Sequence, residues 1–365
     1  MRRGVFAKLA ALTVIVVVVG AACTTDEGDE DQEAGQQPEE GVQSTLQMVQ
    51  DRGTLNCGVN DVVPGFGLQT EDGDFEGFDV DFCKAVAAAV LGDPEAVEYT
   101  PLTVETRLPA LQAGEVDVLI RNTTWTASRD GGEGLTFATT TFYDGQGMMV
   151  REETGFTELE ELDGATICVL SATTTELNLA SVFSSRGIDF EQLSFEDNET
   201  LQQAFEQERC EAWTSDKSQL AGVRSAWPDA QGGPEALFIM EALMSKEPLG
   251  PVTRDGDSQW SQIIDWVVIA TIQAEEYGIT SENIDEMMDS DDPGIARFLG
   301  QPGEEGVFDP GLGLEPDFAV DVINAVGNYG EIYDRHVGPD TPLGLERLLN
   351  DLWTEGGLLF PPPYV

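Results

Sequence analysis

The sequence predicts an α/β fold of two similar lobes, and three observations support this prediction. Its 365 residues exceed the roughly 100–200 residues of a typical domain. Hydrophobic residues make up 41% of the chain, which is enough to bury a core. Two successive regions alternate short apolar strands with helices, the order typical of parallel α/β sheets. Because ligands of such sheets bind beyond the carboxyl ends of the strands, two facing edges would form a cleft.

The first alternation runs from residue 55 to residue 120. Its expected elements are a strand, a helix, a strand, a helix and a strand, at 55–59, 82–91, 97–100, 106–113 and 116–120. The first of these helices is rich in alanine and valine, and Asp79 or Asp81 is its expected N-cap. Both helices end at a glycine.

The second alternation has the same pattern and is followed by a helical region. We expect strands at 165–170, 189–193 and 211–214, and helices at 173–183, 200–207 and 218–224. From residue 258 onward the pattern becomes helical, with expected helices at 260–275, 281–288, 319–327 and 343–353. These C-terminal helices show no recognisable chemistry and are expected to pack on one lobe.

The first 43 residues are expected to direct export and to tether the protein. Three basic residues precede an apolar run at 9–19, which is short for a membrane span and typical of a secretory signal peptide. Cys23 follows two alanines and resembles the lipobox cysteine of bacterial lipoproteins, so we expect removal of 1–22 and lipidation of Cys23. A plain signal peptide with an incidental cysteine is the alternative. Segment 23–43 contains eight acidic residues and no basic one, which predicts a disordered tether.

Charge and histidine content exclude several functions. The chain has 68 Asp and Glu residues against 18 Lys and Arg residues, a net charge of −50. Such a charge repels phosphate backbones, so nucleic-acid binding is not expected. His336 is the sole histidine, so a metal site of several histidines cannot form. We expect no cofactor and no metal.

Four cysteines follow Cys23, namely Cys57, Cys83, Cys168 and Cys210. An even number in an exported chain predicts two disulfides, for which four cysteines allow three connectivities. If each bond lies within one lobe, Cys57 pairs with Cys83 and Cys168 with Cys210. Free thiols are the alternative, and no CxxC spacing indicates a metal site.

Three polar segments directly follow or end expected strands. Residues 121–129 (RNTTWTASR) offer guanidinium, hydroxyl and backbone N–H groups, which suit a carboxylate. Thr173 and Thr174 stand where a helix begins, and such positions also favour an anion. Asp216 follows a strand, and its carboxylate suits an ammonium group. Together the three segments complement a zwitterion such as an α-amino acid.

Each of these segments also has an ordinary structural interpretation. An arginine after a strand often forms a surface ion pair, a threonine run often caps a helix, and an aspartate after a strand is often a turn residue. Their joint position at strand ends is what favours a binding site.

Several longer segments carry a family resemblance: CGVN (57–60), GFDVDFCKAV (77–86), RNTTWT (121–126), YDGQGMMV (143–150), SKEPLGPV (245–252), NYGEIYDRHVG (328–338) and GGLLFPPP (356–363). They resemble the polar amino-acid family of bacterial extracellular solute-binding proteins (family 3), and in particular its general L-amino-acid-binding subgroup. The resemblance covers about residues 44–365. That subgroup serves ABC importers of broad specificity.

The resemblance implies a fold and domain boundaries. The fold is the two-lobe Venus flytrap of type II periplasmic binding proteins, here with extra C-terminal helices. Lobe 1 would comprise 44–144 and 244–365, and lobe 2 would comprise 145–243. Two hinge strands, near 145–150 and 237–243, would join the lobes.

The resemblance also implies roles at the ligand site. Arg129 would bind the α-carboxylate of the ligand, with help from Thr124 and the backbone at Asn122. Asp216 would bind the α-ammonium group, and Thr174 would donate a hydrogen bond from lobe 2.

The side-chain pocket would be lined by the loop after the first strand, through Asn60, Val63 and Phe66. Family members selective for basic amino acids have an acidic residue where Asn60 stands and an aromatic residue where Val63 stands. This chain has neither, which favours a more open pocket, with Arg121 helping acidic or amide side chains.

The expected function is therefore capture without catalysis. A monomeric protein, lipid-anchored on the outer face of the cytoplasmic membrane, would bind an L-amino acid and deliver it to the permease and ATPase of an ABC importer. Two alternatives are a sensory ligand-binding domain for a signalling partner and an enzyme, such as a dehydratase, on the same scaffold. The expected cleft offers Asp216 but no histidine, which disfavours the enzyme.

Overall fold

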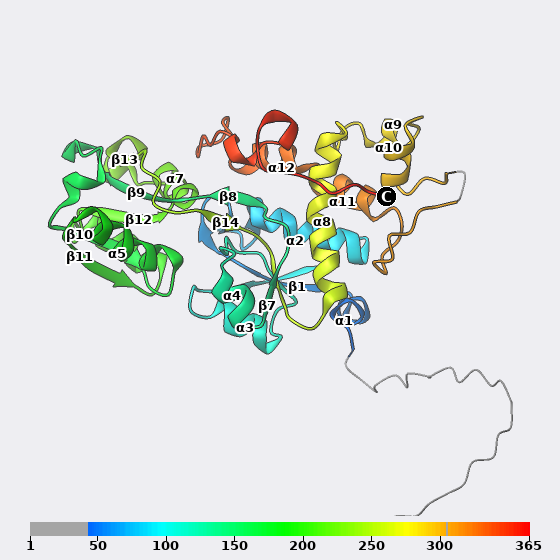
Figure 1. Ribbon diagram of the computed structural model, residues 1–365, viewed down its shortest axis with the longest axis horizontal. Coiled ribbons are helices and arrows are strands. Elements are labelled where there is room, and N and C mark those ends of the chain that lie inside the picture. The colour runs from blue at the N-terminus through cyan, green and yellow to red at the C-terminus, as the bar shows by residue number, and fades with distance from the viewer. Residues whose placement is uncertain (1–42, 304–305) are drawn as a thin grey trace, which may run out of the picture. The chain divides into compact units, whose positions relative to one another are not determined.

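The computed structural model describes residues 43–303 and 306–365, and within them the chain forms two five-stranded sheets (Figure 1). Lobe 1 is built on the sheet with the order β5 (Val97–Pro101), β1 (Leu55–Val59), β6 (Val118–Leu119), β15 (Val252–Arg254), β7 (Leu135–Phe137). Lobe 2 is built on the sheet with the order β11 (Phe190–Phe195), β10 (Ala165–Leu170), β12 (Ala212–Asp216), β9 (Gln146–Arg151), β13 (Leu237–Ile239). The expected signal peptide, Cys23 and nearly all of the expected tether lie outside the described residues.

Each sheet is mixed, although the βα alternation predicts only parallel strands. In lobe 1, β1 pairs in parallel with β5 and β6, whereas β15 pairs antiparallel with β6 and β7. In lobe 2, β10 pairs in parallel with β11 and β12, whereas β9 pairs antiparallel with β12 and β13. The antiparallel strands arise because the chain passes from lobe 1 into lobe 2 and later returns, and each passage contributes strands outside the βα series.

Two short strands form these passages. β8 (Phe142–Asp144) leads into β9, and β14 (Glu247–Leu249) leads back toward β15. β8 and β14 pair antiparallel as a two-stranded sheet, with Asp144 opposite Glu247. A separate three-stranded sheet of β2 (Val62–Val63), β3 (Gly67–Gln69) and β4 (Phe75–Glu76) follows β1.

The helices of lobe 2 lie within residues 174–225: α5 (Thr174–Arg186), α6 (Asn198–Glu206) and α7 (Lys217–Ser225). The other helices are α1 (Thr45–Arg52), α2 (Phe78–Leu91), α3 (Arg107–Ala113), α4 (Ala127–Gly132), α8 (Ser258–Glu276), α9 (Ile284–Met287), α10 (Pro293–Phe298), α11 (Phe318–Val326) and α12 (Tyr329–His336). Among the helices of the described ranges, none combines the length and the apolar character needed to cross a bilayer.

The helix predicted at 343–353 is wrong. That segment contains only two short 3₁₀ helices, η5 (Leu348–Asn350) and η6 (Trp353–Glu355). Leu348 has a φ of +48°, which an α-helix does not accommodate. The side chain of Asn350 accepts a hydrogen bond from the Tyr143 amide at 2.6 Å and donates one to the Tyr143 carbonyl at 3.2 Å. These contacts fasten the segment to β8 in an irregular conformation.

α2 begins earlier than predicted, because a glycine and not an aspartate stands at its N-cap. Gly77 has a φ of +136°, and a Cβ at this position would lie 2.2 Å from the carbonyl oxygen of Phe66. Only glycine fits such a backbone. Asp79 and Asp81, the expected N-caps, instead lie buried in the first turn, where each binds a partner from another segment.

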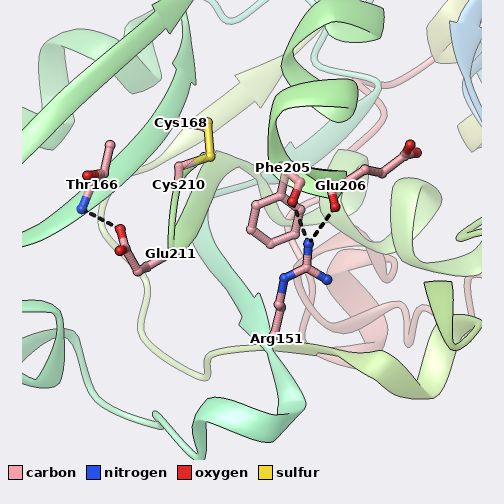
Figure 2. Close-up of a disulfide and its surroundings, with 7 residues drawn as sticks. All are labelled: Arg151, Thr166, Cys168, Phe205, Glu206, Cys210 and Glu211. Carbon is pink, nitrogen blue, oxygen red and sulfur yellow. Dashed lines mark hydrogen bonds between the residues drawn. A yellow bond between two sulfur atoms is a disulfide. The ribbon is translucent and has the colours of Figure 1, made fainter. Parts of the chain in front are cut away.

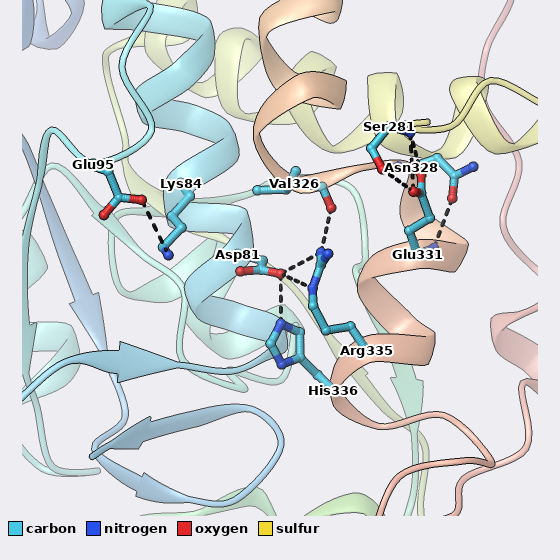
Figure 3. Close-up of polar contacts among 9 residues, drawn as sticks. All are labelled: Asp81, Lys84, Glu95, Ser281, Val326, Asn328, Glu331, Arg335 and His336. Carbon is cyan, nitrogen blue, oxygen red and sulfur yellow. Dashed lines mark hydrogen bonds and ion pairs between the residues drawn. The ribbon is translucent and has the colours of Figure 1, made fainter. Parts of the chain in front are cut away.

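Asp81 joins α2 to α12 in the C-terminal region (Figure 3). Its carboxylate lies 2.7 Å from Nε2 of His336 and 2.8 Å from a guanidinium nitrogen of Arg335. These partners lower the pKa of Asp81 although burial opposes the shift. The sole histidine therefore lies in the C-terminal helical region, at an ion cluster of lobe 1.

Both faces of the lobe 2 sheet are packed. Successive residues of β10 point to opposite faces, so Cys168 and Leu170 pack with α6 residues such as Phe205, while Ile167 and Val169 pack with Phe183 of α5. The bond between Cys168 and Cys210 closes this region, and Figure 2 shows it near Arg151, whose guanidinium lies over the Phe205 ring.

The second disulfide joins Cys57 of β1 to Cys83 of α2, so each lobe holds one bond. This is the connectivity with one pair in each lobe, and it leaves no free thiol among the four cysteines.

Replacing Cys168 and Cys210 together by serine is expected to lower the free energy of unfolding by about 3–4 kcal/mol. The bond spans 42 residues and restricts the unfolded chain accordingly. Urea denaturation followed by tryptophan fluorescence measures the change. The Cys57→Ser, Cys83→Ser variant is the matched comparison in lobe 1, and an unfolding free energy equal to that of the wild type would contradict the prediction.

Candidate binding cleft

One pocket is lined by residues from both lobes. Lobe 1 contributes Asn60, Val104, Arg107, Arg121, Asn122 and Thr124. Lobe 2 contributes Leu170, Thr173, Thr174, Thr175, Asn198, Ser215, Asp216 and Gln219. These residues follow the carboxyl ends of β1, β6, β10 and β12 or lie beside them, which is where an open α/β sheet binds its ligand.

A chain of hydrogen bonds fixes the lobe 1 wall. Asn122 has a φ of +30°, an uncommon conformation for a residue with a side chain. Its amide donates to Oδ2 of Asp79 at 2.7 Å, and its own Oδ1 accepts from Nδ2 of Asn60 at 2.6 Å. Oδ1 of Asn60 is buried and has no hydrogen-bond partner among the described residues. Because Asn60 lines the pocket, this wall has an unsatisfied acceptor beside the ligand site.

Arg107 is the one charged residue among the pocket-lining residues that the sequence did not lead us to expect; the others are Val104, Leu170, Thr175, Asn198, Ser215 and Gln219. Only 4% of it is exposed, and Nη1 makes two long hydrogen bonds of 3.4 Å, to the Arg121 carbonyl and the Thr123 hydroxyl. Among the described residues, Nε has no hydrogen-bond partner and no carboxylate lies within 4.0 Å of the guanidinium. Burial, followed by repulsion from Arg121 and Arg129, holds the pKa of Arg107 well below its usual value.

A signal for Arg107 was present in the sequence. On α3, the buried residues are Arg107, Ala110 and Leu111, at positions i, i+3 and i+4. An arginine on the apolar stripe of a helix is unusual. The pattern therefore indicates a buried cation at this position.

The other two arginines are held by backbone carbonyls. Nε of Arg121 donates to the Leu102 carbonyl at 2.5 Å, and burial lowers the pKa of Arg121 to about 10. Nη1 of Arg129 donates to the Thr124 carbonyl at 2.9 Å. Arg129 does not line the central pocket but an adjoining hollow, which shares Thr124, Thr173 and Thr174 with it.

The lobe 2 wall is formed by the start of α5 and the end of β12. Thr173 is the N-cap of α5, where its hydroxyl accepts from the Glu176 amide at 3.1 Å. The hydroxyls of Thr174 and Thr124 lie 3.5 Å apart across the two lobes. Asp216 is 6% exposed, and no donor from the described residues hydrogen-bonds to its carboxylate.

The environment of the cleft disfavours the charged forms of two carboxyl groups, those of Asp216 and Asp144. Burial raises the pKa of Asp216 well above its usual value, and the charges of Asp144 and Glu247 add to the shift. Burial likewise raises the pKa of Asp144 to about 6, although the amides of Gly145 and Ser218 donate to it. A ligand ammonium group beside these residues would offset their repulsion.

Seven of the ten residues expected at the ligand site line the central pocket: Asn60, Arg121, Asn122, Thr124, Thr173, Thr174 and Asp216. Val63 and Phe66 lie elsewhere, each 1% exposed in the lobe 1 core. The Phe66 ring packs against the rings of Phe78 and Phe142, because β2 and β3 turn this loop inward. The cleft thus combines buried arginines with buried carboxylates, and within the described part of the chain no ion pair joins them.

Residues 55–284 match the family described as bacterial extracellular solute-binding proteins, family 3. The chain belongs to this family. The family is one of solute-binding proteins, and the solved structures that this chain resembles have the two-lobe type II fold. The expectations of family, fold class and a non-catalytic role are confirmed.

Several relatives are similar over most of the chain. The general L-amino acid-binding periplasmic protein AapJ of Rhizobium johnstonii is 46% identical over 88% of this chain and 92% of its own. The glutamate/glutamine/aspartate/asparagine-binding protein BztA of Rhodobacter capsulatus is 47% identical over 88% of this chain and 93% of its own. A solved ABC transporter/periplasmic binding protein from Brucella ovis, with glutathione bound, is 44% identical with a TM-score of 0.85, covering 89% of this chain and all of the other.

Asp79→Asn is expected to change how stability depends on pH. Burial raises the pKa of Asp79 to about 7, against the opposing effects of the Asn122 amide and Arg121. Because the folded-state pKa is raised, folding favours the protonated form, and this stabilisation is lost as the pH rises through 7. Asparagine stays neutral and keeps an oxygen acceptor for Asn122.

The stability of the variant relative to the wild type should therefore increase by roughly 2–3 kcal/mol between pH 5 and pH 8. Chemical denaturation at both pH values measures the difference. A difference that is the same at both values would show that Asp79 does not titrate in this range.

Proposed function

We propose that this protein captures an L-amino acid between its lobes and delivers it to the permease and ATPase of an ABC importer. The observation that carries the proposal is the unpaired opposite charge in one cleft: the guanidinium of Arg107 from lobe 1 and the carboxylate of Asp216 from lobe 2. The relatives named for binding L-amino acids support it.

The ligand would be held by its two charged ends. Asp216 would pair with the α-ammonium group. Arg129, with Thr124 and Asn122, would bind the α-carboxylate from lobe 1. Closure of the lobes would exclude water and strengthen both contacts. In this proposal, lobe 1 comprises residues 44–144 and 244–365, and lobe 2 comprises residues 145–243.

The ligand side chain would meet Arg107, Arg121 and Asn60. These residues offer guanidinium donors and one free amide oxygen, which suit an acidic or amide side chain. One relative is named for binding glutamate, glutamine, aspartate and asparagine, which is the same side-chain class.

A thermal-shift panel of the twenty L-amino acids, run on protein stripped of ligand, tests this function. A ligand present at about 100 times its Kd stabilises the folded protein by about 2.7 kcal/mol. The largest shifts are expected for amino acids with acidic or amide side chains. If no amino acid shifts the unfolding temperature, the proposed function is wrong.

Glutathione is a second candidate ligand. The Brucella ovis relative is described with glutathione bound. In this chain the hollow next to the central pocket contains Lys246, which could receive the glycine carboxylate of a γ-glutamyl tripeptide. Including glutathione in the panel, and competing it against the preferred amino acid, separates the two ligands.

Arg129→Ala and Asp216→Ala are each expected to abolish amino-acid binding while the protein stays folded, because each removes the partner of one ligand charge.

Arg107→Gln is expected to weaken glutamate and aspartate binding at least tenfold and to affect glutamine and asparagine binding less, because it removes the guanidinium that would meet an acidic side chain. Isothermal titration calorimetry gives the affinities, and circular dichroism checks the fold. Full binding by Arg129→Ala or Asp216→Ala would refute the assignment.

The protein is further proposed to work as a monomer tethered through a lipid on Cys23, at the outer face of the cytoplasmic membrane. The tether proposed for 23–43 would reach roughly 25 Å from the membrane, as expected for a flexible chain of about 20 residues.

Cys23→Ala in the full-length chain is expected to release the protein from the membrane fraction into the medium or periplasm, since the acylated thiol would be absent. Fractionation of expressing cells and mass spectrometry of the mature N-terminus test this. Equal membrane association of the variant and the wild type would exclude a lipid on Cys23.

A further inference from the structure

Glu247 lies where the two lobes are joined, and no role in ligand binding has been given to it. It is the first residue of β14, stands opposite Asp144 of β8, and is 1% exposed. A carboxylate so deeply buried needs partners that satisfy its charge.

Most of those partners come from the opposite lobe. Oε2 of Glu247 accepts from the Thr174 hydroxyl at 2.8 Å, and Oε1 accepts from Nδ2 of Asn178 at 3.1 Å. Ser245, two residues before Glu247, also donates its hydroxyl to Oε1. Thr174 and Asn178 are four residues apart on α5, so they lie on one face of that helix. One carboxylate of the returning strand therefore holds the first turn of the main lobe 2 helix.

The contact reaches the ligand pocket through Thr174. This residue lines the pocket, and its hydroxyl lies 3.5 Å from that of Thr124 in lobe 1. Because Thr174 donates its proton to Glu247, its oxygen is left to accept hydrogen bonds from the cleft side. Glu247 thus fixes both the position of α5 and the polarity of one group that would face a ligand.

We propose that Glu247 is a positioning residue that holds the cleft closed around a bound ligand by fastening the first turn of α5 to β14. The inference rests on the proposed function, because it assigns a structural basis to ligand retention at the same site. Separation of the lobes would break hydrogen bonds to a charged, buried acceptor, each of which is worth more than a neutral one. Glu247 should therefore act mainly on the rate at which the ligand leaves.

Two changes separate this role from a general contribution to folding. Glu247→Ala removes the acceptor. Asn178→Asp leaves Glu247 in place and sets a second carboxylate against it, so the two lobes repel each other at this contact. Asn178→Ala is the neutral comparison at the same position. Asn324→Asp, on the exposed side of α11 in the C-terminal region, is the matched control for an added charge.

The rates are measured by stopped-flow fluorescence with the amino acid that gives the largest shift in the thermal panel. Glu247→Ala is expected to raise the dissociation rate about tenfold to a hundredfold and to change the association rate less than about threefold. Asn178→Asp should raise the dissociation rate more than Asn178→Ala does, and Asn324→Asp should leave it unchanged.

Small-angle X-ray scattering, with and without the amino acid, gives a second readout that needs no kinetic model. Asn178→Asp should have a larger radius of gyration than the wild type at the same ligand concentration. Unchanged dissociation rates in both Glu247→Ala and Asn178→Asp, or equal radii of gyration in all variants, would overturn the proposal.

A failure of the proposed function gives a different result. In that case the wild type itself binds no amino acid, whereas the scattering of Asn178→Asp against the wild type still tests the contact between the lobes. If the wild type binds and the variants retain the ligand equally well, only the role of Glu247 is refuted.

Discussion

The cleft is governed by two opposite charges that are buried together without pairing. Arg107 and Asp216 line the same pocket, yet the guanidinium has only long hydrogen bonds and no described donor bonds to the carboxylate. Burying charged groups without a direct ion pair is costly, and burial shifts the pKa of both groups although their charges attract each other. In the proposed binding mode, the ligand ammonium group compensates Asp216, and an acidic ligand side chain compensates Arg107. The buried charges of Arg107 and Asp216 therefore limit which ligands the proposed site can hold: the ligand must carry both a positive and a negative group.

The residues behind the cleft hold its polar groups in place, and one of these residues, Asn122, has an energetically unfavourable backbone conformation. Asn122 keeps a left-handed backbone because the buried carboxylate of Asp79 accepts its amide, and Asn60 is oriented by Asn122 in turn. Asp79 itself depends on the start of α2, which only Gly77 permits. Uncommon conformations of this kind persist where the surrounding structure enforces them, and they concentrate at functional sites.

Much of the fold was predictable because it follows from local pattern. The strand at 55–59, the strand at 165–170 and the long apolar helix near 260–275 agree with β1, β10 and α8 within two residues. The antiparallel strands β9, β13 and β15 were not predictable from periodicity, since their pairing depends on how the chain passes between lobes. The C-terminal segment near Asn350 looked helical, but tertiary hydrogen bonds to β8 override that preference.

The candidate site divides in the same way. Polar segments at strand ends, such as the one around Asn122 and the one around Thr174, were visible in the sequence because parallel strands bring their carboxyl ends together. Arg107 and Glu247 were not singled out. Arg107 lies on a short helix whose apolar pattern is set by its leucines. Glu247 has its hydrogen-bond partners on α5, about 70 residues earlier in the chain, so its sequence neighbours do not indicate its contacts. Val63 and Phe66 were expected in the pocket because of their loop, whereas the turn of that loop directs them into the core.

The position of β15 in the lobe 1 sheet has a consequence for biogenesis. β15 lies between β6 and β7, which precede it in the chain by more than 100 residues, whereas the strands of lobe 2 are contiguous from β9 to β13. When the chain folds from its N-terminal end onward, lobe 2 can complete its sheet as soon as residue 239 is available. Lobe 1 must wait for residues 252–254, with the gap between β6 and β7 unfilled and its edges exposed to aberrant pairing. Oxidative maturation in lobe 1, between Cys57 and Cys83, can begin before that gap is filled, which restrains the nascent half-sheet until its last strand arrives.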